Sequence, residues 1–208
     1  MSSHNIILIS GKMGSGKTTL SGHISEIFSA DGYRVSQMKF ADIIYELHDY
    51  ILKTLIENGV NHGITKDRAL LQFLGTDFGR RIDKDIWAKI ALRRAMEKIK
   101  YRQETGVTRS IIIIDDARFE NEFNIFSDAL RVRLEAPEDV RKYRAESWSD
   151  VPHPSETGLD QYAMDAKFDM YFNTAELRPE HIATLLMSKI KRGSWVERRI
   201  APVSLDHT

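Results

Sequence analysis

The stretch "LISGKMGSGKTTLSGHI", residues 8–24, decides the fold that we expect for this protein. From Gly11 to Thr18 it matches the phosphate-loop pattern G-x-x-x-x-G-K-[ST], in which glycines let successive backbone N–H groups converge on phosphate oxygens. The apolar run "NIILIS" before the loop indicates a buried strand, and an amphipathic helical pattern follows the loop. This order of strand, loop and helix is the required one, because the helix N-terminus adds its dipole to the anion site.

The loop predicts a phosphate site that also takes a magnesium ion. Lys17 can reach the outer phosphates, and Thr18 can offer its hydroxyl to Mg²⁺. The alternative is a glycine-rich turn with no ligand, which the flanking strand and helix make the weaker interpretation. The residues that we expect to hold a nucleotide are Gly11, Met13, Gly14, Ser15, Gly16, Lys17, Thr18 and Thr19.

The composition is that of an ordinary globular chain. Its 208 residues suffice for one domain with a hydrophobic core and a small insertion. The 30 basic and 30 acidic side chains cancel, which weakens the case for a nucleic-acid substrate, and the absence of cysteine excludes thiol catalysis and cysteine-bound zinc. No signal-peptide pattern and no apolar run approaching the ~20 residues of a membrane span are seen. We therefore expect a soluble, cytoplasmic protein without a membrane partner.

Alternating strand and helix patterns predict an α/β fold with a parallel five-stranded sheet flanked by helices. Apolar runs suited to buried strands lie at Ile6–Ile9, Val35–Phe40, Ile111–Ile114, Val132–Leu134 and Met170–Phe172. Helical patterns lie at 40–59, 67–81, 84–106, 137–148 and 178–193. The long connection between the second and third strands predicts extra helices over the carboxyl edge of the sheet, where ligands bind in such folds. We expect one domain over residues 1–192 and a loosely held tail at 193–208.

The segment "IIIIDDARFENEF", residues 111–123, is the second strong signal. Four isoleucines predict a strand buried on both faces, and the aspartates at its end lie where a phosphate-loop enzyme places the acid that organises magnesium. Asp115 and Asp116 are both candidates, although one of them could instead cap the helix predicted near Phe119. Arg118 and Glu122 would be neighbours on a helix, so an ordinary surface ion pair is the simpler interpretation of their spacing.

Two further segments gather polar side chains. In "RALLQFLGTDFGRRIDKDIWA", residues 68–88, arginines crowd around Gly75-Thr76, and the planar fork of arginine suits phosphate because it donates two parallel hydrogen bonds. In "PEDVRKYRAESWSDVPHPSETGLD", residues 137–160, a helix with Arg141 and Arg144 leads into a loop rich in Pro and Ser. This second pattern is typical of a lid that closes over phosphates, and equally of a solvated basic face.

Together these segments resemble the phage-type deoxynucleoside monophosphate kinases, a group similar in turn to animal phosphomevalonate kinase. The resemblance rests on "SGKMGSGKTT", "LLQFLGTDFGRRIDKDIWA", "IDDARFENEF" and "SETGLD", in the family's order over residues 10 to about 190. The phosphate loop is shared by many unrelated enzymes, whereas the other three blocks are much more selective. One departure is that the region 41–66, which would help to form the acceptor pocket, is shorter than in the larger phage enzymes.

The resemblance implies a P-loop NTPase fold of the nucleoside monophosphate kinase type, with an acceptor-binding region at about 41–104 and a lid at about 141–160. It implies transfer of the γ-phosphoryl group of ATP, with Mg²⁺, to a deoxynucleoside monophosphate, in a host cell if the protein is phage-encoded. The implied catalytic residues are Lys17, Arg118, Arg141 and Arg144. The implied acceptor-binding residues are Asp42, Arg68, Gln72, Arg80, Trp87, Asp116, Arg118 and Glu122, although Trp87 could equally be a core residue. The implied magnesium ligands are Thr18 and Asp115.

Other acceptors and another class of function remain open. The same kinase design could act on 5-hydroxymethyluracil in DNA, for which Trp195 among the cations of "SKIKRGSWVERRI" could stack on a base, or on a phosphorylated metabolite such as phosphomevalonate. An NTP-driven switch is the alternative outside the kinases, although no guanine-recognition motif is evident. A third interpretation gives the arginine clusters a purely structural role. The oligomeric state is also open, with a homodimer among the alternatives.

Overall fold

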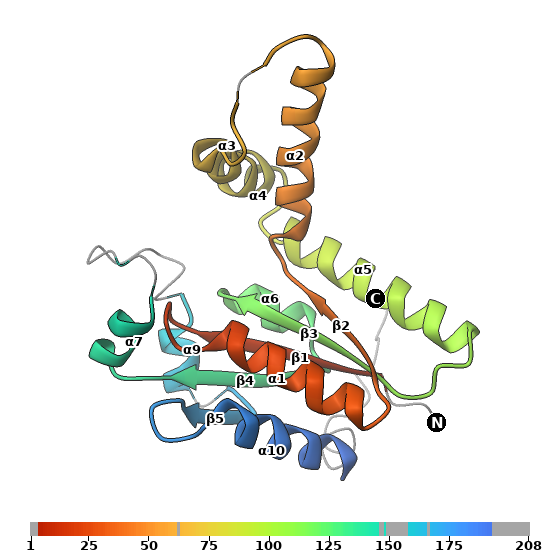
Figure 1. Ribbon diagram of the computed structural model, residues 1–208, viewed down its shortest axis with the longest axis vertical. Coiled ribbons are helices and arrows are strands. Elements are labelled where there is room, and N and C mark those ends of the chain that lie inside the picture. Colours follow the sequence, from red (N-terminus) through yellow and green to blue (C-terminus); the bar gives the residue numbers. More distant parts are fainter. Residues whose placement is uncertain (1–3, 62, 146–147, 149–157, 166, 193–208) are drawn as a thin grey trace, which may run out of the picture.

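The computed structural model describes residues 4–61, 63–145, 148, 158–165 and 167–192. The strands are β1 (His4–Gly11), β2 (Arg34–Met38), β3 (Ser110–Ala117), β4 (Leu130–Glu135) and β5 (Met170–Asn173). They form one sheet in the order β2-β3-β1-β4-β5, and all neighbouring pairs are parallel (Figure 1). The five predicted strands and the predicted α/β fold are confirmed.

Helices occupy the connections between the strands, and one more follows the last strand. They are α1 (Lys17–Ala30), α2 (Asp42–Glu57), α3 (Arg68–Gln72), the π-helix η1 (Phe73–Phe78), α4 (Gly79–Ile82), α5 (Ile86–Glu104), α6 (Glu120–Ile125), α7 (Glu138–Arg144), α9 (Asp160–Met164) and α10 (Pro179–Lys191). The sequence patterns predicted most of them, but they did not predict α9 or the division of 67–81 into α3, η1 and α4.

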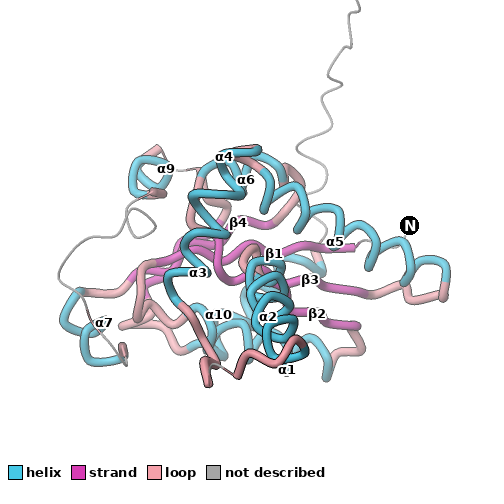
Figure 2. The backbone as a smooth tube through the Cα atoms, turned by 90° about the horizontal axis from the view of Figure 1, so that it is seen from above, coloured by secondary structure: helices cyan, strands magenta, loops and turns pink. Residues whose placement is uncertain are grey.

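The hydrophobic core lies on both faces of the sheet, because side chains alternate along each strand. Ile7 and Ile9 of β1 pack in one cluster with residues of α1 and α10, including Ile182. Leu8 packs in a second cluster with α5 and with Phe123 of α6. Figure 2 shows α1 and α10 on one side of the strands and α5 and α6 on the other. Strands covered on both faces explain why their sequences are almost continuously apolar.

The helices α2, α3, η1 and α4 form a projection, here called the arm (residues 42–82), beyond the carboxyl end of β2 (Figure 1). His48, buried in α2, accepts the backbone N–H of Asp67 at Nε2 (3.0 Å), so its other ring nitrogen donates to Asp49 (2.8 Å). Asp67 in turn caps α3 by accepting the N–H of Leu70 (3.0 Å). These bonds join the body of α2 to the start of α3 and so connect the two sides of the arm.

The π-helix in the arm has an identifiable cause in Trp87 of α5. The indole Nε1 donates to the carbonyl oxygen of Gly75 (2.7 Å), which an α-helix would pair with the N–H of Gly79. A Cβ atom added to Gly79 would lie only 2.0 Å from Trp87 Cζ2, so the ring occupies the space beside this glycine. The tryptophan therefore fixes the local widening of the helix.

Parts of two predicted regions lie outside the described residues. These are 146–147 and 149–157 of the predicted lid, and the predicted tail at 193–208, which contains Trp195. Among the helices that the structure describes, none is both long enough and apolar enough to cross a membrane.

Candidate active site

The phosphate loop lies between β1 and α1, at the carboxyl edge of the sheet. β1 ends at Gly11, and the 14-residue helix α1 begins at Lys17. Gly14 and Gly16 have φ angles of 77° and 88°, in the left-handed region that favours glycine. The Lys17 ammonium donates to two carbonyl oxygens of the loop, at 2.5 and 3.1 Å, and so lies within the loop. This is the strand, loop and helix arrangement that the sequence predicted.

Two glycines of the loop also allow a close approach of neighbouring segments. A Cβ atom added to Gly11 would lie 2.6 Å from the carbonyl oxygen of Leu134 in β4. One added to Gly14 would lie 2.3 Å from the carbonyl oxygen of Arg141 in α7. Any side chain at these positions would push β4 or α7 away from the loop. The loop therefore packs directly against the segment that carries the predicted lid arginines.

Asp115 lies near the end of β3, the strand that pairs with β1, and is 7% exposed. Burial raises the pKa of its carboxyl group, and the charges of Lys39 and Lys17 partly offset that rise. Its neighbours Ile114 and Ala117 pair with Leu8 and Ser10 of β1, so Asp115 belongs to the part of β3 beside the strand end that leads into the phosphate loop. The predicted role of Asp115 in binding magnesium stays a prediction.

Asp116, the next residue, forms hydrogen bonds with another segment of the protein. Its two carboxylate oxygens accept the backbone N–H groups of Phe40 (2.9 Å) and Ala41 (3.1 Å), directly before α2 begins. Burial is the main cause that raises the pKa of Asp116 from 3.8 to about 6, although both hydrogen bonds lower it. Asp116 therefore attaches the base of the arm to β3. This geometry differs from the predicted direct contact with the acceptor.

Glu122 is a second buried carboxylate on the same side of the loop. It accepts the backbone N–H groups of Arg118 (2.7 Å) and Phe119 (3.0 Å), and burial raises its pKa from 4.5 to about 7. The expectation of an Arg118–Glu122 pair on a helix surface was wrong, because α6 begins only at Glu120 and Glu122 is buried. Arg80 lies 3.8 Å from Glu122 and 4.3 Å above the Phe119 ring. Two predicted acceptor residues, Arg80 of the arm and Glu122 of α6, thus meet here.

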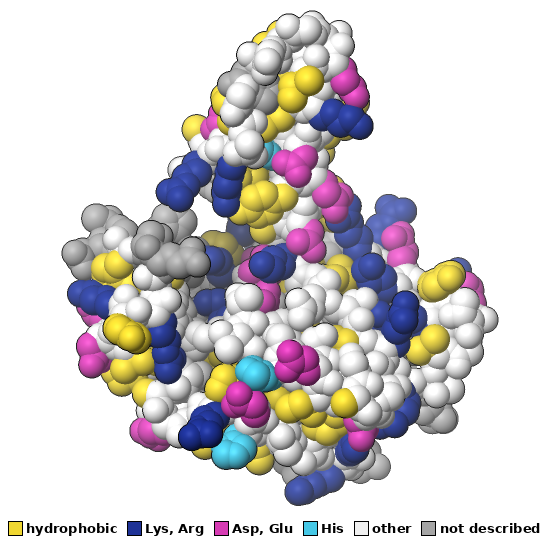
Figure 3. Space-filling model, in the orientation of Figure 1, with side chains coloured by type: hydrophobic (Ala, Val, Ile, Leu, Met, Phe, Trp, Pro, Cys, Tyr) yellow, Lys and Arg dark blue, Asp and Glu magenta, His cyan; other side chains and the backbone are white. Residues whose placement is uncertain are grey.

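The other predicted acceptor residues are distributed over the arm. Arg68 and Gln72 are exposed on α3, and Asp42 accepts the N–H of Lys39 (2.8 Å) at the start of α2. Trp87 of α5 is 5% exposed and bonded to the arm backbone, which agrees with the alternative that it is a core residue. Figure 3 shows Lys and Arg side chains gathered where the arm meets the rest of the molecule.

The two predicted lid arginines of α7 both connect to the phosphate loop. Arg141 donates to the carbonyl oxygen of Met13 (3.4 Å). Arg144 donates to the hydroxyl (2.9 Å) and the carbonyl oxygen (3.0 Å) of Thr174, whose hydroxyl donates to the carbonyl oxygen of Ser15 (3.1 Å). Sequence reasoning missed Thr174, although its position directly after a predicted strand marks the ligand-binding edge of a parallel sheet.

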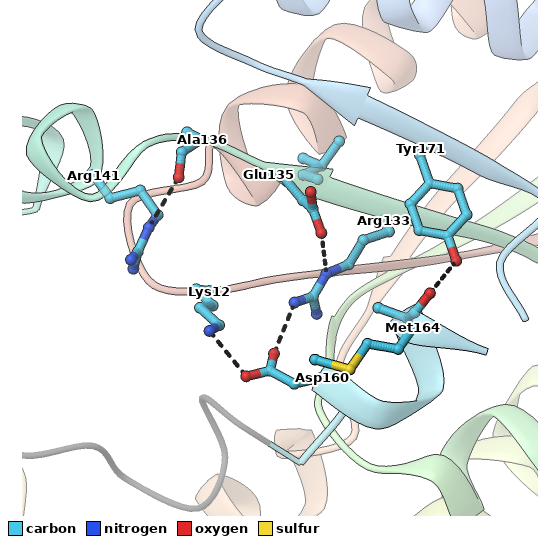
Figure 4. A pocket seen from close by; sticks show the side chains of 10 residues that line it. Lys12, Arg133, Glu135, Ala136, Arg141, Asp160, Met164 and Tyr171 are labelled. Atoms are coloured by element: carbon cyan, nitrogen blue, oxygen red, sulfur yellow. Dashed lines mark hydrogen bonds and ion pairs between the residues drawn. The ribbon is translucent and has the colours of Figure 1, made fainter. Parts of the chain in front are cut away.

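A cavity of about 520 Å³ opens beside the loop, with residues of α7 and α9 among those that line it (Figure 4). It is lined by Lys12, Arg133, Leu134, Glu135, Ala136, Arg141, Asp160, Ala163, Met164 and Tyr171. Sequence reasoning missed Lys12, Arg133 and Asp160. The signal for Arg133 was present, because Arg131 and Arg133 alternate with apolar residues along β4 and so share one face.

The donors at this edge suit the phosphates of a nucleotide and a magnesium ion. The loop offers backbone N–H groups at a helix N-terminus, together with the Lys17 ammonium. The exposed Thr18 hydroxyl and the Asp115 carboxylate are oxygen ligands, the kind that Mg²⁺ prefers.

A phosphate loop between β1 and α1 of a five-stranded parallel sheet defines the chain as a P-loop protein. A family model described as an AAA domain, AAA_18, matches residues 7–152, which include most of β1, the phosphate loop and β2 to β4. The chain belongs to this AAA domain family. No curated protein matches its sequence.

Solved structures resemble the chain over nearly all of its length. TT1252 from Thermus thermophilus has a TM-score of 0.51 and 17% sequence identity, covering 91% of this chain and 98% of that one. The shikimate kinase of Aquifex aeolicus has a TM-score of 0.49 and 12% identity (91% and 98% covered). The shikimate kinase of Acinetobacter baumannii, in complex with shikimate, has a TM-score of 0.46 and 13% identity (92% and 96% covered). At these identities the likeness concerns the fold alone.

Proposed function

We propose that this protein is an ATP-dependent kinase that transfers the γ-phosphoryl group to a deoxynucleoside monophosphate and so forms the diphosphate. One observation carries the proposal: arginines contact the phosphate loop on one side, and further arginines lie at and near the end of the strand that pairs with β1 on the other side. Arg141 and Arg144 reach the loop from the β4–β5 side of the sheet. On the β3 side, Arg118 directly follows Ala117, which pairs with Ser10 at the end of β1, and Arg80 of the arm lies 3.8 Å from Glu122. Two phosphate-bearing reactants that meet over one loop need such cations on each side.

On the donor side, the loop amides and Lys17 would bind the phosphates of ATP. Arg141 and Arg144 would neutralise the charge that spreads over the transferred group. Thr18 and Asp115 would hold Mg²⁺, which supplies further neutralisation of the phosphate oxygens when bound. Positioning and charge neutralisation are most of what phosphoryl transfer demands of a protein.

On the acceptor side, Arg118 and Arg80 would bind the phosphate of the acceptor, and Arg68, Gln72 and Asp42 of the arm would contact its sugar or base. Asp116 accepts one backbone N–H group at each carboxylate oxygen, whereas Glu122 accepts two at Oε2 and has Arg80 Nη2 3.8 Å from Oε1. Neither carboxylate is therefore well placed to act as a general base. This favours an acceptor whose own phosphate is already an anionic nucleophile. A hydroxyl acceptor would need a base to take its proton.

An ATP-coupled turnover assay with Mg²⁺ tests this function. The acceptors are the four deoxynucleoside monophosphates, 5-hydroxymethyl-deoxyuridylate, phosphomevalonate and hydroxymethyluracil-containing DNA. We expect turnover on one or more monophosphates. Turnover on DNA or phosphomevalonate alone would support the kinase activity but contradict the proposed monophosphate acceptor. ATP binding without turnover on any acceptor would contradict the kinase and favour a nucleotide-driven switch.

A further inference from the structure

Asp160, the first residue of α9, bridges two cations from distant parts of the chain (Figure 4). Its carboxylate accepts from Lys12 Nζ of the phosphate loop at 3.0 Å and from Arg133 Nη2 of β4 at 3.3 Å. Arg133 also donates from Nη1 to Ser10 Oγ of β1 at 3.1 Å. The chain on both sides of Gly11 is therefore connected to α9, on one side through Lys12 and on the other through Ser10 and Arg133.

The burial of Arg133 makes Asp160 a specific partner. The Arg133 side chain is 6% exposed, and a guanidinium that has lost most of its hydration needs a counter-charge. The carboxylate of Glu135 is 3.6 Å from Arg133 Nε, but it is largely exposed and screened by water. Asp160 is less exposed than Glu135 and is also paired with Lys12. It is therefore the carboxylate best placed to hold Arg133 and the loop together.

The helix α7 contacts the same loop through different residues. Arg141 donates to Met13, and the α7 backbone approaches Gly14 closely. Neither contact involves Asp160. The loop thus contacts α7 and α9 at separate positions, so one connection can be removed while the other is left intact.

We propose that Asp160 is a positioning residue that transmits nucleotide binding from the phosphate loop to α9. The proposal rests on the proposed binding of ATP to the loop. Bound phosphates would order the loop backbone and hold Lys12 and Ser10 in place. Forming the ion pairs with Asp160 would then cost less conformational entropy. α9 would then open less often in the nucleotide complex. Lys12 occupies a variable position of the phosphate-loop pattern, so this role is separate from the consensus contacts to phosphate.

Hydrogen–deuterium exchange of the full chain, with and without ADP and Mg²⁺, tests the connection. The peptides to compare cover residues 10–20 and 158–165. In the unsubstituted protein we expect nucleotide to slow exchange in both, by about fivefold or more in α9. In Asp160→Asn the loop should still be slowed, while the slowing in α9 is lost. Asp160→Glu should restore it at least in part.

Two further variants make the test specific. Glu97→Gln removes an exposed pair on α5, Arg93 Nε to Glu97 Oε1 at 3.0 Å, and should respond to nucleotide like the unsubstituted protein. Lys12→Met leaves Asp160 paired with Arg133 and should give an intermediate loss in α9. This variant decides the question if Asp160→Asn does not fold.

The outcomes separate this proposal from the proposed function. Slowing of α9 that survives in Asp160→Asn and Lys12→Met would overturn the role of Asp160. A slowed loop with unchanged α9 exchange in the unsubstituted protein would overturn it too, while leaving nucleotide binding in place. An unchanged loop in the unsubstituted protein would overturn nucleotide binding, and the role of Asp160 with it.

Discussion

At the scale of single residues, Lys17 and Arg118 belong to the two sides of the proposed reaction. Lys17 lies inside the phosphate loop, whereas Arg118 follows β3 and has its backbone N–H held by Glu122. Replacing each of these side chains should therefore affect ATP binding and acceptor binding to different extents.

Lys17→Ala should lower turnover by roughly a hundredfold or more and weaken the binding of ATP, because it removes a preorganised cation at the transferred phosphate. Turnover assays and calorimetric titration with ATP measure the two effects. Lys98→Ala, at an exposed position of α5, is the matched control and should change neither. Full turnover in Lys17→Ala would contradict the assignment of the loop.

Arg118→Ala should raise the KM for the acceptor by about tenfold or more and leave the dissociation constant of ATP almost unchanged. Steady-state kinetics with each substrate varied in turn measures the difference. Arg81→Ala, an exposed arginine of α4, serves as the control. Equal losses for both substrates would argue against an acceptor role for Arg118.

At the scale of elements, two contacts define the arm. Asp116 attaches its base to β3, and Trp87 packs against its π-helix. Both contacts join segments that are far apart in the sequence or that belong to different helices. They can be tested through stability, independently of activity.

The pH dependence of stability should report on Asp116. Burial raises the pKa of Asp116 in the folded state from 3.8 to about 6. The folded protein therefore binds the proton of this carboxyl group more tightly than the unfolded chain does. The free energy of unfolding should therefore fall as the pH rises from about 4 to about 6, by roughly 3 kcal/mol at most. Asp116→Asn cannot ionise and should remove this contribution, as measured by chemical denaturation at several pH values. An unchanged pH profile in that variant would show that other groups cause the pH dependence. Asp128→Asn, at an exposed position, is the control.

Gly79→Ala should destabilise the protein by about 1–3 kcal/mol, because the new Cβ would lie 2.0 Å from the Trp87 ring. Gly22→Ala is the matched control, since a Cβ in this α1 glycine meets nothing within 4 Å and a helical alanine is favoured. Denaturant unfolding of both variants gives the comparison. Equal stability of the two would mean that Trp87 does not confine the π-helix.

At the scale of the whole molecule, the phosphate loop connects the ends of several elements. α7, α9 and the end of β5 all reach it, through Arg141, Asp160 and Thr174 respectively. A nucleotide bound at the loop could therefore influence both α7 and α9, the helices at the two ends of the predicted lid.

Arg144→Ala should lower kcat by about tenfold or more with little change in ATP affinity, because it removes the α7 cation that contacts Thr174 and would close on the transferred phosphate. Measurements of kcat and of ATP binding at equilibrium distinguish the two effects. A parallel rise in the ATP dissociation constant would instead indicate a contact in the ground state. Arg192→Ala, beyond the last turn of α10, is the control.

The sequence by itself determined the phosphate loop, the five strands and most of the helices, because these depend on glycine conformation and on apolar periods within about twenty residues. It also marked Asp115 and Asp116 without separating them. Only the tertiary structure decided that Asp116 holds the arm, that Trp87 packs against Gly79 and that Asp160 pairs with Lys12. The physical reason is distance along the chain: Lys12 and Asp160 are 148 residues apart, and no local pattern records which charges the folded chain brings together.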